Sequence, residues 1–135
     1  MKILGIDYGL KRIGLAFSET GLAEPLSVIR HPRKTSPRGR QSSVIRKIAG
    51  VCQKYGVEKI VIGLPEGEIA TKVREFGKKL SFFTKLPVVF QDETLTSQDA
   101  IAKMIEAGKG RKTRKRIQDA IAAAIILQSY LNSHV

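Results

Sequence analysis

Three β-prone segments follow one another at the start of the chain, and helices and strands alternate after them. The first three are residues 2–7, 12–18 and 26–30, and Gly-containing connections separate them. The segment 31–40 holds two prolines and four Lys or Arg residues and is predicted to be a loop. Periodicity then predicts a helix capped by Ser42 or Ser43 and ending at Gly56, strand 58–63, helix 69–83, strand 87–93, helix 96–107 and a last helix ending near residue 132.

This order of elements predicts one α/β domain over residues 1–135. The first three strands should pair antiparallel, and the later βαβ crossovers should add parallel strands to the same sheet. The result is a five-stranded mixed sheet flanked by helices, which is the chain order of an RNase H-like domain. The chain shows no internal repeat and no linker that would divide it.

Composition narrows the functional classes. The formal net charge is +12 on only 135 residues, which favours a polyanionic partner, most often nucleic acid. The lone Cys52 cannot form an internal disulfide, so a reducing, cytoplasmic location is expected. Asp7 interrupts the first apolar run, and the longest stretch without formal charge, 120–133, is shorter than the ~20 residues of a membrane span. We therefore expect a cytoplasmic protein without a membrane partner.

Acidic residues stand where two predicted strands end. Asp7 closes the first strand, and Asp92 and Glu93 close the last. If these strands are parallel, their ends share the sheet edge where ligands of open α/β sheets bind. Asp119 stands near the start of the last helix, whose alanines favour a close approach to the sheet. A carboxylate on such an apolar helix face costs several kcal/mol unless a charge compensates it.

Two interpretations of these acids remain open. Arg or Lys side chains could neutralise each acid separately, with Asp119 simply favoured by the helix dipole. Alternatively, Asp7, Glu93 and Asp119 converge on Mg²⁺ or Mn²⁺, since both cations prefer carboxylate ligands. Beside a basic surface, such cations activate water and stabilise the leaving oxygen in phosphodiester cleavage.

Basic residues gather next to these acids. Lys11 and Arg12 lie in the connection after the first strand, and a dense basic run precedes Asp119; the run comprises Lys109, Arg111, Lys112, Arg114, Lys115 and Arg116. Such side chains bind phosphates and carry little sequence information. Aromatic residues make up only 6% of the chain, so recognition of a duplex or junction by shape is more natural than base stacking.

Competing catalytic arrangements are weaker. His31 and His134 stand beside no serine or cysteine in a triad pattern, and the chain has no Walker loop or GxGxxG motif. The opening GIDYG also resembles the phosphate-binding start of actin-like kinases, but these need two such domains to enclose ATP.

Four stretches together resemble one family. They are GIDYGLKRIGLAFS (5–18), IVIGLPEG (60–67), KLPVVFQDETLTSQDA (85–100) and RIQDAIAAAIILQSYL (116–131), and they are similar to the bacterial YqgF/RuvX family of pre-16S rRNA nucleases and Holliday junction resolvases. The resemblance covers nearly the whole chain. It implies an RNase H-like, divalent-metal-dependent nuclease with Asp7, Glu93 and Asp119 as catalytic acids and metal ligands.

Three departures from the family pattern bear on substrate choice and rate. Leu10 replaces a small hydroxylated residue, Thr94 replaces an arginine, and the loop after Pro65 is shortened. We expect an endonuclease that processes the 5′ end of pre-16S rRNA. A four-way DNA junction is the second substrate, and a catalytically silent nucleic-acid-binding module is the rival hypothesis. The oligomeric state, monomer or homodimer, stays open.

Overall fold

The computed structural model describes residues 1–32, 37–93 and 118–134. Its sheet has five strands in the order β3-β2-β1-β4-β5, with β1–β2 and β2–β3 antiparallel and β1–β4 and β4–β5 parallel. The strands are β1 (Ile3–Tyr8), β2 (Arg12–Ser18), β3 (Glu24–Arg30), β4 (Lys59–Leu64) and β5 (Val88–Asp92). This confirms the predicted mixed sheet.

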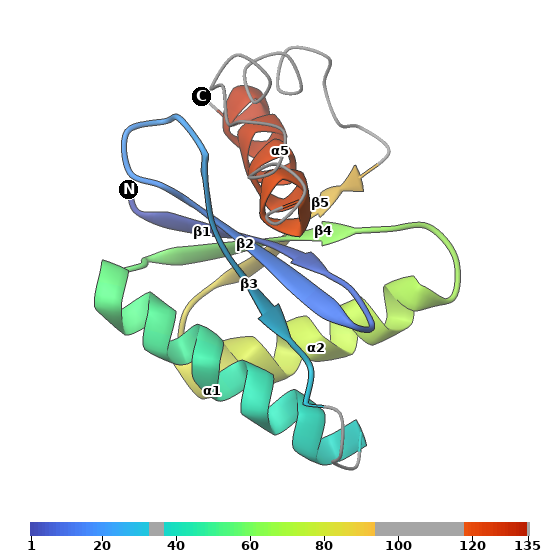
Figure 1. The fold of residues 1–135 in the computed structure, drawn as a ribbon. Helices are drawn as coiled ribbons and strands as arrows, with labels where there is room; N and C mark the ends of the chain where they lie inside the picture. The colour runs from blue at the N-terminus through green and yellow to red at the C-terminus, as the bar shows by residue number, and fades with distance from the viewer. Residues whose placement is uncertain (33–36, 94–117, 135) are drawn as a thin grey trace.

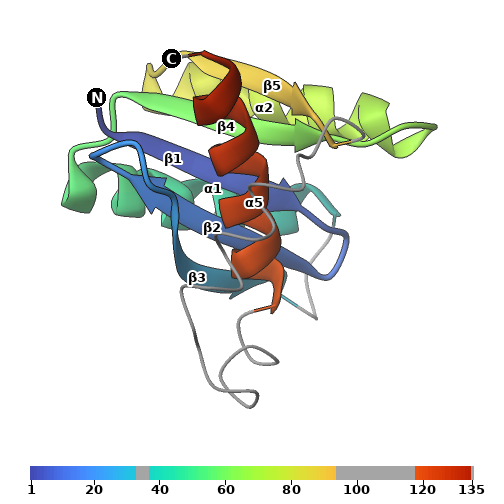
Figure 2. The same ribbon diagram turned by 90° about the horizontal axis from the view of Figure 1, so that it is seen from above.

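The described part of the chain has three helices, and they cover both faces of the sheet. Helices α1 (Pro37–Tyr55) and α2 (Ile69–Thr84) cover one face, and α5 (Gln118–Ser133) crosses the other (Figures 1 and 2). No helix in the described part of the chain is both long and apolar enough to cross a bilayer. The predicted helix 96–107 lies outside the described residues.

The start of α1 differs from the prediction. The helix begins at Pro37, inside the segment predicted to be a loop, and neither Ser42 nor Ser43 caps it. Proline fits the first turn of a helix because its missing N–H would have no intrahelical partner there. A proline- and glycine-containing sequence therefore predicted a turn where the chain already enters the helix.

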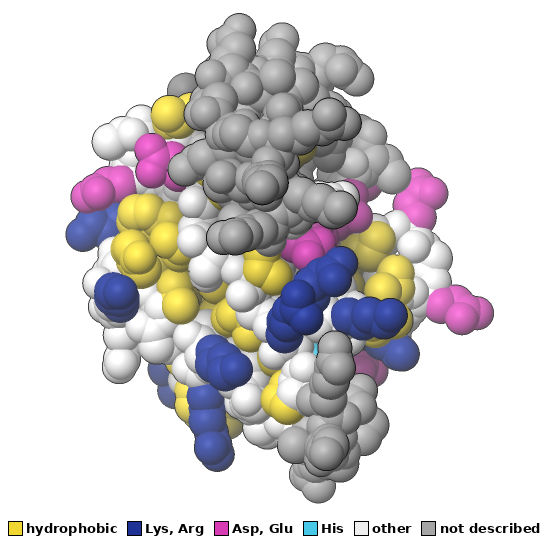
Figure 3. Space-filling model, in the orientation of Figure 1, with side chains coloured by type: hydrophobic (Ala, Val, Ile, Leu, Met, Phe, Trp, Pro, Cys, Tyr) yellow, Lys and Arg dark blue, Asp and Glu magenta, His cyan; other side chains and the backbone are white. Residues whose placement is uncertain are grey.

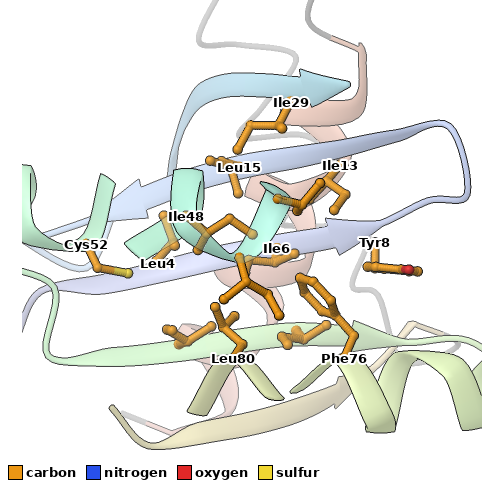
Figure 4. Close-up of a cluster of buried hydrophobic side chains, with 14 of the residues drawn as sticks. Leu4, Ile6, Tyr8, Ile13, Leu15, Ile29, Ile48, Cys52, Phe76 and Leu80 are labelled. Carbon is orange, nitrogen blue, oxygen red and sulfur yellow. The ribbon is translucent and has the colours of Figure 1, made fainter. Parts of the chain in front are cut away.

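The two faces of the sheet bury different cores. Large side chains of β1, β2 and β4 pack against α1 and α2, with Phe76 and Leu80 of α2 fully buried between them (Figure 4). On the other face the core is thin, because Ala123 and Ala124 of α5 lie directly on the strands. The thin core brings the backbone of α5 close to the sheet, as its alanines predicted.

Candidate active site

Asp7 lies on the sheet face that α5 covers. Side chains alternate along a strand, and Ile6 and Tyr8 belong to the core under α1 and α2, so Asp7 points to the opposite face. The residue is half-buried, and it forms no ion pair within the described residues. Its carboxyl group is thus held near apolar surroundings at the end of a strand.

Glu93 reaches the same place from β5, the strand at one edge of the sheet. It directly follows β5, and β5, β4 and β1 are mutually parallel, so their carboxyl ends lie along one edge (Figure 1). The Glu93 side chain is hydrogen-bonded to that of Asp7. Two carboxyl groups that are 86 positions apart in sequence therefore meet, as the strand ends predicted.

The electrostatics of Asp7 reflect this crowding. Burial, the largest cause, acts together with the neighbouring charge of Glu93, the hydrogen bond to Glu93 and the charge of Asp119 to raise the pKa of Asp7 to about 7. Each cause disfavours the ionised form. A carboxyl group with its pKa near neutrality, at a sheet edge shared with two other acids, is typical of a functional site rather than a structural one.

Asp119 lies in the first turn of α5 and is close enough to raise the pKa of Asp7. Its own carboxylate is paired with Arg12, whose Nε donates to Oδ2 over 2.8 Å. The Asp119 side chain is 31% exposed, so it is less buried than the apolar helix face suggested. The hypothesis of separate neutralisation thus holds for Asp119 and not for Asp7.

Two glycines make room for the acids, and neither was predicted from the sequence as part of the site. Gly14 is the register partner of Asp7, and a side chain there would overlap the backbone carbonyl of Asp119. At Gly63 a Cβ atom would lie 2.7 Å from Oε1 of Glu93. A glycine inside a strand often marks such a close approach, which was the available signal.

The loop between β1 and β2 is held by His31. Its Nε2 lies 2.9 Å from the carbonyl oxygen of Gly9, and its backbone N–H donates to the carbonyl of Lys11 over 3.1 Å. The ring also packs edge-on against Tyr8, with ring centroids 5.8 Å apart. These contacts fix the loop beside Asp7 and leave the side chains of Leu10 and Lys11 exposed.

The basic residues predicted to bind nucleic acid have different outcomes. Lys11 is exposed near the acids, and Arg12 is half-exposed and holds Asp119. On this side of the molecule acidic and basic side chains lie in contact (Figure 3). The residues of the basic run, Lys109, Arg111, Lys112, Arg114, Lys115 and Arg116, lie outside the described residues, as does Thr94.

The three acids form a donor set that suits a hard divalent cation, because all their oxygens are carboxylate oxygens. Asp7 and Glu93 are in contact, whereas Asp119 is turned to Arg12. As arranged, the described side chains contain no group of three or more His, Cys, Asp or Glu residues around one point. The donor chemistry thus suits Mg²⁺ or Mn²⁺, whereas the arrangement of the side chains keeps Asp119 paired with Arg12.

Comparison with solved structures supports the fold. The Thermus thermophilus RuvC in complex with a Holliday junction substrate is 18% identical, with a TM-score of 0.69, covering 99% of this chain and 95% of that one. A Fowlpox virus resolvase, solved in complex with Holliday junction DNA, is 15% identical with a TM-score of 0.66, covering 100% and 99%. At these identities the likeness establishes the RNase H-like fold.

Comparison of sequences goes further. A protein of Caldanaerobacter subterraneus subsp. tengcongensis, named "Putative pre-16S rRNA nuclease", is 40% identical over 144 residues, spanning 98% of this chain and 97% of the relative. The model of the RuvX family, described as Holliday junction resolvase, matches residues 1–133. The match extends from the strand that carries Asp7 to the helix that carries Asp119. The chain belongs to the RuvX family.

Proposed function

We propose that the protein is a divalent-metal-dependent endonuclease that cleaves phosphodiester bonds in structured nucleic acid. The observation that carries the proposal is the meeting of Asp7 and Glu93 beside Asp119 at one sheet edge, with burial and the neighbouring acids raising the pKa of Asp7 to about 7. Uncompensated buried carboxylates cost free energy of folding, so their convergence is better explained by a ligand than by stability.

Asp7 and Glu93 would hold Mg²⁺ or Mn²⁺, and Asp119 would complete the site. The cation supplies Lewis-acid activation of water and of the scissile phosphate. Arg12 would release Asp119 to the cation, and its guanidinium has five N–H donors, of which the pairing with Asp119 employs only Nε. The remaining donors and Lys11 can hold phosphate oxygens next to the acids. This would orient the nucleic-acid backbone for in-line attack.

The precursor of 16S rRNA is the first choice of substrate, because the sequence relatives carry that name. A four-way DNA junction is the second, on the description of the family model. A junction must be cut in two strands, which requires a dimer with C₂ symmetry, whereas RNA processing can be done by a monomer. Either substrate places the enzyme in the cytoplasm, where the lone buried Cys52 stays reduced.

The test compares cleavage of a pre-16S rRNA fragment and of a four-way DNA junction, with Mg²⁺ and with EDTA. Asp7→Asn keeps the size of the side chain but cannot supply an anionic ligand, so cleavage should fall by a factor of about 10² or more. Glu24→Gln is the matched control, because Glu24 is exposed at the start of β3, away from the acids. It should cleave at the wild-type rate.

The rival hypothesis, a silent binding module, makes a different forecast. It expects both substrates to be bound equally well in Mg²⁺ and EDTA, and neither to be cut. An Asp7→Asn variant that cleaves as fast as the wild type would contradict the proposed mechanism even if the protein proved to be a nuclease.

A further inference from the structure

Two adjacent phenylalanines lie exposed at the end of α2. Phe82 is 78% exposed and Phe83 is 54% exposed. Phe83 follows the helical spacing of the buried Val73, Phe76 and Leu80, but it lies near the end of the helix, where the chain turns at Lys85. Large exposed rings side by side are uncommon on a protein surface and mark a contact site.

A hollow between α1 and α2 adjoins these rings. Its volume is about 730 Å³, and its lining includes Ile45 and Arg46 of α1 with Lys78, Lys79, Phe82 and Phe83 of α2. A second hollow of similar volume shares Arg46 and Phe83 and reaches Val57 and Leu86, just before β4 and β5 begin. The surface is therefore recessed as well as apolar, and we call these lining side chains, with Lys85, the Phe82–Phe83 patch.

The patch is strongly cationic. Arg46, Lys78 and Lys79 form no ion pair within the described residues. The Lys85 Nζ atom lies 4.5 Å from the centre of the Phe82 ring, and α1 contains no acidic residue. A ligand for this surface must bring negative charge together with flat apolar faces.

Single-stranded nucleic acid has both properties. Its phosphates match the cations of the patch, and its bases stack on aromatic rings without regard to sequence. A second copy of the chain fits poorly, since a symmetric contact would oppose the same uncompensated cations of both copies. We propose that the Phe82–Phe83 patch is a second binding site, for a single-stranded segment of the nucleic-acid substrate.

The position of the patch defines what it would bind. Asp7 and Glu93 lie at the carboxyl ends of the parallel strands, whereas Val57 and Leu86, which line the second hollow, lie just before the amino ends of β4 and β5. The six residues of β4 alone span about 20 Å at ~3.3 Å per residue. The proposal rests on the proposed function: a strand cut at the acids would continue around the molecule, with its flank held on the patch.

The test is fluorescence anisotropy with a labelled oligouridine of about 10 nucleotides, longer than the strands at ~3.4 Å per nucleotide. Binding is measured in EDTA, so that it is independent of cleavage. Phe82→Ala/Phe83→Ala should weaken binding at least about fivefold. Phe82→Tyr/Phe83→Tyr, which keeps both ring faces, should restore it. Leu22→Ala, which removes an exposed apolar side chain elsewhere, should have no effect.

Unchanged oligouridine binding by the double alanine variant overturns the proposal. So does a change from dimer to monomer in the free variant by sedimentation, because the patch would then be an interface between copies. Equally tight binding of a poly-glutamate peptide by the wild type would indicate a protein partner and likewise contradict it. None of these outcomes affects the cleavage assay with Asp7→Asn, so the two proposals fail separately.

Discussion

At the scale of single residues, the site depends on the absence of a side chain at Gly14 as well as on the acids themselves. Asp7 is paired in register with Gly14, and Gly14 lies against the backbone of Asp119. A side chain at Gly14 would push α5 away from the sheet. The distance between the two acids is therefore set by a glycine that has no chemistry of its own.

Gly14→Ala should reduce cleavage by tenfold or more and destabilise the fold by about 1–3 kcal/mol, because the new Cβ overlaps the Asp119 carbonyl. Cleavage rate and urea unfolding measure the two effects. Gly50→Ala is the matched control, because a Cβ there meets no atom within 4 Å. It should leave cleavage unchanged and stabilise the helix by about 0.5–1 kcal/mol. Full cleavage by Gly14→Ala would refute this role of the glycine.

The raised pKa of Asp7 predicts a pH dependence of stability in the absence of divalent cations. The folded protein holds the Asp7 proton up to about pH 7, whereas the unfolded chain releases it near 3.8. The folded state thus binds more protons between these values, and this contribution to the free energy of unfolding is lost as pH rises through about 7.

Urea unfolding in EDTA at about pH 5 and about pH 8.5 measures this loss. The wild type should lose more stability over that interval than Asp7→Asn, which has no proton to release. Equal losses in the two proteins would mean that the Asp7 carboxyl is not held in its neutral form.

At the scale of elements, α5 is joined to the sheet by a buried glutamine. Gln128 is 1% exposed, its Oε1 accepts from the Ala23 N–H over 2.9 Å, and its Nε2 donates to the Gly21 carbonyl over 3.2 Å. The β2–β3 turn is thereby tied to the helix that carries Asp119.

Gln128→Leu should destabilise the fold by about 1–3 kcal/mol, because it leaves the buried Ala23 N–H and the Gly21 carbonyl without their partner. Thermal or urea unfolding measures the effect. Asn132→Ala, which removes only an acceptor at the exposed end of the helix, should change stability by less than about 0.5 kcal/mol. Equal effects of both substitutions would show that Gln128 does not anchor α5.

Elements with strong local patterns were predicted well from the sequence. Strand β2 has the predicted bounds, and β1, β4, β5 and α2 agree within one residue. The start of α1 was wrong, because Pro37 and Gly39 favour turns in isolation while a helix tolerates Pro in its first turn. Phe83 shares the helical spacing of the buried Val73, Phe76 and Leu80 and is nevertheless exposed, because spacing alone does not show what the end of a helix covers.

At the scale of the whole molecule, the meeting of Asp7 and Glu93 followed from strand order. Parallel strands bring their carboxyl ends to one edge, and that rule needs no contact information. The Arg12–Asp119 pair could not be predicted, since its partners are 107 residues apart and spacing says nothing about which cation reaches which acid. The room made by Gly14 and Gly63 also depends on register, which the sequence leaves open.

The acids and the Phe82–Phe83 patch lie at opposite ends of the parallel strands. The acids lie where the parallel strands finish, and the Phe82–Phe83 patch lies where they begin. The formal net charge of +12 on the chain favours a polyanionic substrate that is long enough to contact both ends. Cleavage at one end and binding at the other would suit a substrate much larger than the enzyme.

The central claim is that Asp7, Glu93 and Asp119 together form one site for divalent cations. Crystals soaked in Mn²⁺ test it most directly, since the anomalous signal of manganese locates the ion without assumptions about the ligands. The account predicts a peak between the carboxylates of Asp7 and Glu93, with Asp119 released from Arg12 to face it. A map with no peak at this edge, or with Mn²⁺ only at other acids, would contradict the account.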